Sequence, residues 1–266
     1  MRRPVWLATL TLLATSLIPA LTIPAMAADL AAHRAVYKLT LASSRGAVSA
    51  AVGTMAFELA DACEGWTTRQ RLRINTTIDG GQNIEIGSDY ATFESKDGRN
   101  LRFSMRQTTE QAISSETEGQ ASLPASVTTT GEVRYTSPEA KTIALPAGTV
   151  MPNMHTIAVI DAARAGKKFL AIPLFDGTSA EGAQDTSVAI FSWDKPAPHK
   201  FDVLSALPSS RMRIAFFDRT QGATMPDYEL GIRYYENGIA DAISMDFGDF
   251  VIRGVLQELT VLPKGC

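Results

Sequence analysis

The sequence predicts a mainly β protein, built as one antiparallel sheet with a single short helix near the middle of the chain. Three observations support this fold class. Apolar residues recur at every second position through most of the chain, short turn signals separate these segments, and only one segment has helical spacing. Strands joined by tight hairpins give an antiparallel meander, whereas a parallel sheet needs long crossover connections.

The first 27 residues have the three parts of a secretory signal peptide. Two arginines precede an apolar run over Val5–Ile18, and Ala25-Met26-Ala27 supplies the small residues of a cleavage site. The alternative is a transmembrane anchor, which needs about 20 apolar residues. This run is shorter and is followed by prolines. We therefore expect cleavage near Ala27, export to the periplasm, and one mature domain over 28–266 without a membrane span.

The charge balance argues against nucleic acid as a partner. The chain carries 25 basic and 28 acidic residues, and loss of the two N-terminal arginines leaves a net charge of −5 (23 − 28). The charges are interspersed, whereas a nucleic-acid-binding domain presents a basic patch or stripe. Anionic lipid headgroups are not favoured by simple charge attraction either.

The only two cysteines are Cys63 and the terminal Cys266. In an oxidising compartment an even count favours pairing. A bridge would close a loop of about 200 residues, and loop entropy sets its upper contribution at about 5 kcal/mol. A redox pair would show Cys-x-x-Cys and a zinc site would show His or Cys at ligand spacing. Neither pattern occurs, so we predict a structural Cys63–Cys266 disulfide, with an intermolecular bridge as the alternative.

Alternating segments occupy most of the first half of the mature chain. Strands are expected at 36–41, 52–59, 66–78, 84–94 and 101–105, followed by more polar strands at 113–118 and 133–136. In the third of these segments Arg69, Arg71 and Arg73 alternate with positions that include Leu72 and Ile74, as in a strand. The pair Asp97-Gly98 separates two segments and predicts a hairpin.

Helical spacing occurs from His155 to Gly166, where Ile157, Ile160 and Ala163 fall on one face. A proline lies just ahead of this segment, and Gly166 suits a C-terminal cap. A helix of about ten residues is therefore expected, either covering a face of the sheet or closing the mouth of a curved sheet.

Alternation resumes in the C-terminal third. Strands are expected at 169–175, 228–235, 243–247 and 250–261. Asn237-Gly238 joins two of them and is the strongest short hairpin signal available. The sequence contains no low-complexity linker and no clear repeat. One curved sheet is the simplest arrangement, and two domains divided near residue 150 are the alternative.

The sequence contains no recognisable catalytic, cofactor or metal motif. His33, His155 and His199 are not at paired ligand spacing, and no nucleophile elbow, phosphate-binding loop or Ser-x-x-Lys is present. His155, at the expected helix start, is the best single polar candidate, and a capping or packing role is its alternative. We therefore predict a protein that is not an enzyme.

Several further polar and aromatic residues are expected to have structural rather than catalytic roles. Asp246 and Asp249 are close in sequence and are expected to be solvated in a turn. Trp66 is expected to be a core residue shielding the disulfide. Tyr234 and Tyr235 fall on opposite faces of a strand, which would expose at least one of them.

Several short segments together resemble the EipB family of periplasmic cell-envelope integrity proteins. They are His33-Arg-Ala-Val-Tyr37, Gly53–Phe57 with Cys63 and Trp66-Thr-Thr, Thr92-Phe-Glu-Ser-Lys-Asp-Gly98, Leu145-Pro-Ala-Gly148 with Met151-Pro-Asn-Met-His155, Phe175-Asp-Gly177, and Asn237-Gly238 with Asp246-Phe-Gly-Asp-Phe250 and Cys266. Each segment is short, but their order covers nearly all of the mature chain.

The resemblance implies a broken, spiral-like antiparallel β-barrel with a helix packed in its concave side and a disulfide, here between Cys63 and Cys266. It also implies a non-enzymatic role in envelope integrity and a periplasmic tetratricopeptide-repeat partner. It supplies no catalytic residues.

Three functions remain open at this point. A binding or scaffold protein predicts a monomer with an exposed surface for a protein partner. A carrier of lipid or lipoprotein acyl chains predicts an apolar cavity of several hundred Å³. A hydrolase of envelope polymers would need a catalytic constellation, and none is visible in the sequence.

Overall fold

A computed structural model describes residues 29–219 and 224–266. The predicted signal peptide over 1–27 lies outside these ranges. Within them, fourteen strands form one antiparallel sheet, which confirms the predicted fold class. Neither helix in the described ranges combines the length and the apolar content needed to cross a membrane.

The first strand of the chain lies in the middle of the sheet, because β1 pairs with β2 on one side and with β14 on the other. One half consists of β1 (His33–Ser44), β2 (Val48–Asp61), β3 (Gly65–Ile78), β4 (Asn83–Ser95), β5 (Asn100–Thr109), β6 (Ala112–Ser122), β7 (Gly131–Ser137) and β8 (Lys141–Leu145). The other half consists of β14 (Phe250–Val261), β13 (Ala240–Asp246), β12 (Tyr228–Tyr235), β11 (Ser209–Phe217), β10 (Gln184–Ile190) and β9 (Phe169–Leu174). The two edge strands, β8 and β9, are not paired with each other, so the barrel stays open.

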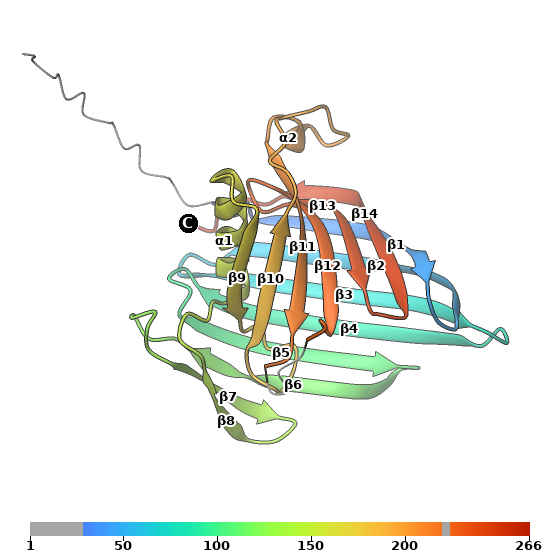
Figure 1. Ribbon diagram of the computed structural model, residues 1–266, viewed down its shortest axis with the longest axis horizontal. Helices are drawn as coiled ribbons and strands as arrows, with labels where there is room; N and C mark the ends of the chain where they lie inside the picture. The colour runs from blue at the N-terminus through green and yellow to red at the C-terminus, as the bar shows by residue number, and fades with distance from the viewer. Residues whose placement is uncertain (1–28, 220–223) are drawn as a thin grey trace, which may run out of the picture.

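The two halves of the sheet face each other across the core. Figure 1 shows the long strands β3–β6 running across the shorter strands β9–β13. The ladder is interrupted at Val36/Tyr37, at Leu41/Ser43 and at Arg233/Tyr234. Such bulges bend strands and increase their twist, which lets a single sheet curl back on itself.

The first half follows the predicted period of two. On β1, His33, Tyr37 and Leu39 are buried, whereas Arg34 and Lys38 are exposed. Residues that point inward from both halves of the sheet form one large apolar cluster. A smaller cluster beneath β5–β8 is built around three aromatic rings, Phe103, Tyr135 and Phe175, whose centroids are 5.4–6.4 Å apart.

The predicted helix is α1 (Pro152–Arg164), and it lies on the concave side of the sheet beside β9. It begins three residues earlier than its apolar spacing suggested, because proline is favoured in the first helical turn. Val159 and Ile160 are fully buried against the sheet.

Four elements were not predicted from the sequence: strands β8, β10 and β11, and the one-turn helix α2 (Asp202–Ser205). Their segments are short or interrupted by polar residues, so the local pattern alone did not indicate them.

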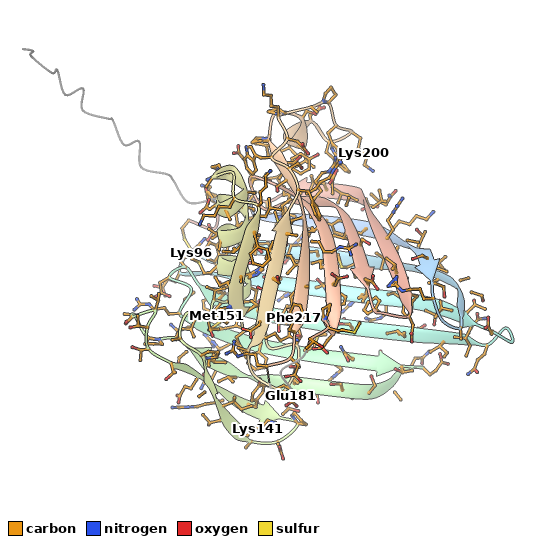
Figure 2. The ribbon with its side chains drawn as sticks, in the orientation of Figure 1. Lys96, Lys141, Met151, Glu181, Lys200 and Phe217 are labelled. Carbon is orange, nitrogen blue, oxygen red and sulfur yellow. A yellow bond between two sulfur atoms is a disulfide. The ribbon has the colours of Figure 1, made fainter. Side chains whose placement is uncertain are left out.

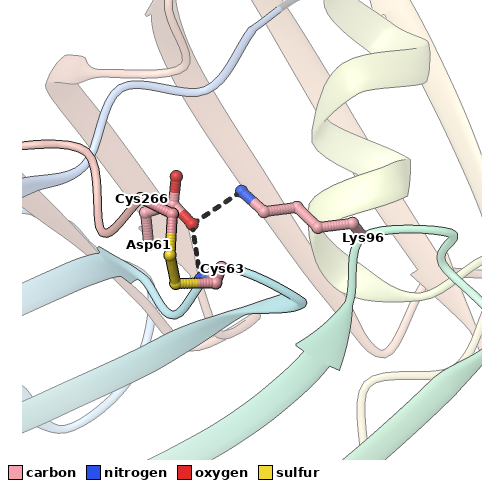
Figure 3. Close-up of a disulfide and its surroundings, with 4 residues drawn as sticks. All are labelled: Asp61, Cys63, Lys96 and Cys266. Carbon is pink, nitrogen blue, oxygen red and sulfur yellow. Dashed lines mark hydrogen bonds and ion pairs between the residues drawn. A yellow bond between two sulfur atoms is a disulfide. The ribbon is translucent and has the colours of Figure 1, made fainter.

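The structure joins Cys63 to Cys266 by a disulfide, with Cα atoms 5.4 Å apart (Figure 3). Cys63 lies in the β2–β3 turn, where its N–H donates to Asp61 Oδ1 at 3.0 Å. Lys96 pairs with the same carboxylate at 3.0 Å and lies 4.1 Å above the ring of Trp66. Trp66 is a core residue, as predicted, and the ammonium group of Lys96 makes a cation–π contact with the face of its ring. The bridge therefore fixes the C-terminal tail to a turn that is itself held by Asp61 and Lys96.

Removal of the disulfide by Cys266→Ser is expected to lower the free energy of unfolding by about 2–5 kcal/mol, since the open chain gains entropy on unfolding. At about 2–4 °C per kcal/mol for a domain of this size, the thermal midpoint should fall by at least about 4 °C. Calorimetry with and without reductant measures this effect. Melting curves unaffected by either reduction or the substitution would contradict a stabilising role.

Candidate functional site

The N-terminus of α1 is buried inside the sheet and requires hydrogen-bond acceptors. The preceding residue, Met151, which is labelled in Figure 2, is fully buried and offers no side-chain cap. Glu94, on β4, supplies the acceptors instead. Its two carboxylate oxygens accept hydrogen bonds from Asn153 N–H at 2.7 Å and Met154 N–H at 3.1 Å. A strand carboxylate thus replaces the local cap that helix N-termini normally use.

Glu94 is fully buried, and burial raises the pKa of its carboxyl from 4.5 to about 7. The N–H groups of Asn153 and Met154 act in the opposite direction, because they stabilise the anion. The positive end of the helix dipole favours the anion as well. Near neutral pH this group is therefore close to the midpoint of its titration.

A second buried carboxyl lies in the turn after β9. Burial raises the pKa of Asp176, whose Oδ1 accepts hydrogen bonds from the N–H and the hydroxyl of Thr178 at 2.9 and 2.8 Å. The hydroxyl of Tyr90 donates to the backbone carbonyl of Asp176 at 2.6 Å. Gly177 has a φ of +75°, and a Cβ there would overlap the ring of Phe103. Close packing against β4 and β5 therefore dictates this turn.

These contacts bring together three segments that are separate in the sequence. They are the segment around Glu94, the start of α1 at 152–155, and the turn at 175–177. Gly98 belongs to the same assembly, because a Cβ at that position would overlap the side chain of Met154. We call this arrangement the helix seat. The sequence resemblance pointed to each segment singly, and the fold joins them.

His155, the best single candidate from the sequence, has a structural role in this arrangement. Its Nε2 lies 3.0 Å from the hydroxyl of Thr186, which itself donates to Ile172 O at 2.6 Å. Nε2 therefore carries the proton that is donated to Thr186. Burial lowers the pKa of His155 to about 4, so the ring is neutral at physiological pH and ties α1 to β9 and β10.

The other two histidines have separate partners. His33 Nδ1 donates to Ala31 O at 2.7 Å. The His199 ring lies between Phe201 N–H, at 3.1 Å from Nδ1, and Asp241 Oδ2, at 3.1 Å from Nε2. Within the described ranges, no group of three or more His, Cys, Asp or Glu residues is arranged to hold a metal ion.

The remaining candidates from the sequence are also structural. Asp246 pairs with Arg45 at 2.7 Å, while the backbone carbonyl of Asp249 accepts from Arg45 N–H.

The expectation that Tyr234 or Tyr235 would be exposed was wrong. Tyr235 is buried and Tyr234 half-buried, because the bulge at Arg233/Tyr234 and the ring of His199, 5.8 Å away, alter their surroundings.

A cavity of about 190 Å³ lies between α1 and the concave side of β1, β2, β12 and β13. Its walls are mostly apolar and include Leu30, Met55, Leu59, Leu230, Ile232 and Met245. Gln70, Asn153 and Thr156 add a few polar groups on the side of β3 and α1. We call this space the inner cavity.

The outer face of β1–β5 carries a groove of about 680 Å³. Its charged lining consists of Arg34, Glu58, Arg69, Arg71, Asp89 and Arg106. Both carboxylates are engaged, Glu58 with Arg34 and Asp89 with Arg71 and Arg73. Arg69 makes no ion pair or side-chain hydrogen bond in the described part of the chain. Arg106 pairs with Glu116 at 2.7 Å, so Arg69 is the guanidinium of this outer groove that has no carboxylate partner among the described residues.

The open antiparallel sheet with a helix seated inside it defines a class of β-barrel-like proteins. A crystal structure of a β-barrel-like protein of a domain of unknown function from Brucella abortus matches it with a TM-score of 0.81. That match has 30% sequence identity and covers 89% of this chain and 100% of the other.

The sequence comparisons identify the family. The EipB-like family model matches residues 24–263. The cell envelope integrity protein EipB of Brucella abortus (strain 2308) is 31% identical over 249 residues, covering 91% of this chain and 88% of that protein. The chain belongs to the EipB-like family, as the resemblance of its motifs predicted.

The raised pKa of Glu94 predicts a specific pH dependence of stability. Because its pKa is higher in the folded chain, the folded state binds the proton more tightly, and this stabilisation is lost as pH rises from about 4.5 through about 7. The shift corresponds to about 3 kcal/mol in the free energy of unfolding. Glu94→Gln should remove this loss, so the variant gains stability relative to wild type as pH rises.

Urea unfolding of both proteins between about pH 5 and pH 8 measures this difference. The comparison isolates Glu94, because His155 and Asp176 titrate in both proteins. A constant difference between the two proteins across this range would contradict the ionisation of Glu94 near neutral pH.

Proposed function

We propose that this protein is exported to the periplasm and supports cell-envelope integrity by binding rather than by catalysis. Its membership of the EipB-like family and its similarity to a cell envelope integrity protein support this role. The disulfide supports an oxidising compartment after export. The mature chain then acts as one domain over 28–266 and as a monomer.

A binding role agrees with how the titratable groups of the helix seat are used. Glu94 binds a helix terminus, His155 binds Thr186, and Asp176 binds Thr178. Each is committed to holding the fold. A hydrolase needs a base or nucleophile free to reach its substrate.

The outer groove is the observation that supports a protein partner. Its positive groups surround a floor that includes Val36, Ala56 and Ala91. Arginine is enriched at the energetic centres of protein interfaces, where it combines charge with apolar contact. A partner with acidic side chains around a small apolar patch suits this surface. The family resemblance suggests a periplasmic tetratricopeptide-repeat protein for this position.

The inner cavity supports a second function, that of a carrier of lipid or lipoprotein acyl chains. Its apolar walls suit hydrocarbon. Its volume of about 190 Å³ is below the roughly 300–1,000 Å³ of pockets for drug-sized ligands. The space therefore suits one chain and is too small for the several chains of a lipoprotein.

Reversal of charge in the outer groove tests the first function. In a strain lacking this gene, the double variant Arg69→Glu, Arg71→Glu should fail to restore resistance to detergent and bile salts, since it would repel an acidic partner. Arg253→Glu, on the exposed face of β14, is the matched control and should restore resistance fully. Immunoblotting and periplasmic thermal melts confirm that all variants are folded and equally abundant. Full complementation by the double variant would exclude the outer groove as the essential surface.

A further inference from the structure

We propose that the inner cavity binds the single acyl chain of a monoacyl amphiphile, with the acyl carbonyl at Gln70 and the end of the chain towards Tyr228. This inference rests on the second function above and specifies its ligand. It does not depend on the protein partner at the outer groove.

The shape of the cavity favours one extended chain. Four successive inward residues of β12, Tyr228, Leu230, Ile232 and Tyr234, line it along one side. At about 3.3 Å per residue, this wall is about 20 Å long. A small volume spread over that length leaves room for a single slender hydrocarbon chain rather than for a branched or fused-ring ligand.

The walls provide dispersion and hydrophobic contacts without a fixed charge. Among residues 29–219 and 224–266, the lining contains no Lys, Arg, Asp or Glu. The lining includes His33, and burial lowers the pKa of its ring below the usual value, which disfavours the charged form. A phosphate or ammonium headgroup would have no counter-charge inside the cavity and would remain in solvent. The buried part of the ligand is therefore uncharged.

Gln70 provides the polar contact for such a ligand. It is half-buried, points inward from β3 and makes no side-chain hydrogen bond in the described ranges. An amide held at an apolar wall without a partner can donate to a carbonyl oxygen and accept from a hydroxyl. The ring of His33 adds an acceptor nearby, because its Nδ1 is occupied by Ala31 O and Nε2 keeps its lone pair.

The strand register places this polar group at one end of the cavity and an aromatic row at the other. Gln70 is level with Phe57 and Ala35, whereas Tyr37, one inward position further along β1, bonds the carbonyl of Ala240 at the start of β13. Tyr228 begins β12, which runs in the opposite direction to β13. The two groups therefore lie at opposite ends of the cavity.

The aromatic row links the cavity to the surface. Phe216, Tyr228, Phe247 and Phe250 follow one another with ring centroids 5.5, 5.3 and 5.1 Å apart. Tyr228 lines the cavity, and Phe247 is 41% exposed. Phe217, labelled in Figure 2, is the residue after Phe216 at the end of β11. The row therefore continues the apolar surface beyond the end of the cavity where the terminal methyl group of the chain is placed.

Binding of defined amphiphiles to the purified, oxidised mature chain tests the proposal. Native mass spectrometry and calorimetry would use dodecanoic acid, 1-dodecanoylglycerol, a dodecanoyl lysophospholipid and a didodecanoyl phospholipid. One equivalent of at least one single-chain probe should bind, at least tenfold more tightly than the two-chain probe. The affinity order among the three single-chain probes identifies whether the acyl carbonyl comes from a free acid, a neutral ester or a lysolipid.

Two filling variants and one control locate the site. Ala240→Phe adds a ring inside the cavity and should weaken binding at least tenfold, and Leu230→Trp serves if the first variant does not fold. Ala242→Phe makes the same change on the outward side of β13 and should leave affinity within twofold of wild type. Gln70→Leu keeps the wall apolar and should weaken binding three- to tenfold by removing the contact to the carbonyl.

Absence of binding by all single-chain probes would overturn the proposal, as would equal affinity of wild type and a folded filling variant. Preference for the two-chain phospholipid would overturn the single-chain assignment. Each of these three results would leave the proposed role of the outer groove intact, because that role is measured by complementation in cells.

Discussion

The buried N-terminus of α1 is the constraint on which the rest of this architecture depends. A helix placed inside a curved sheet brings unpaired N–H groups into a region that water does not reach, and each would be costly without an acceptor. Glu94 resolves this by accepting two of them from β4. The bond joins the helix to the first half of the sheet, while His155 joins it to the second half through β10. Both halves are therefore held by one short helix.

The disulfide reinforces the same end of the molecule. Lys96 lies two residues beyond Glu94 and contacts both Asp61 and Trp66, so the turn that holds Cys63 is adjacent to the strand that holds α1. The C-terminal tail is anchored there as well, since Leu262 N–H donates to Ala32 O at 2.8 Å. An open sheet lacks the hydrogen bonds that close a complete barrel. The helix seat and the disulfide provide long-range connections of a different kind.

The two faces of the same strands have different chemistry. On β1–β3 the inward residues form part of the apolar wall around the inner cavity, and the outward residues include the arginines of the outer groove. A strand separates these faces by the thickness of one backbone, because successive side chains point in opposite directions. One segment of sequence can thus serve a hydrophobic ligand on one side and an acidic partner on the other. The two proposed sites can be changed independently at residues that line only one of them, such as Arg69 for the outer groove and Leu230 for the inner cavity.

The sequence by itself determined the class of fold, most of the strands, the one long helix and the Cys63–Cys266 pair. These features are local or depend on counting: alternation marks a half-buried strand, Asn237-Gly238 marks a hairpin, and two cysteines leave one intramolecular pairing. The alternation of Arg69, Arg71 and Arg73 in β3 was visible in the sequence as well. Only the tertiary structure decided the helix seat, the inner cavity and the outer groove. Glu94 and Asn153 are 59 residues apart, and nothing near Glu94 indicates that its partners are helix N–H groups. The cavity depends on how β1 and β2 approach β12 and β13 across the curled sheet, a distance that local periodicity does not encode.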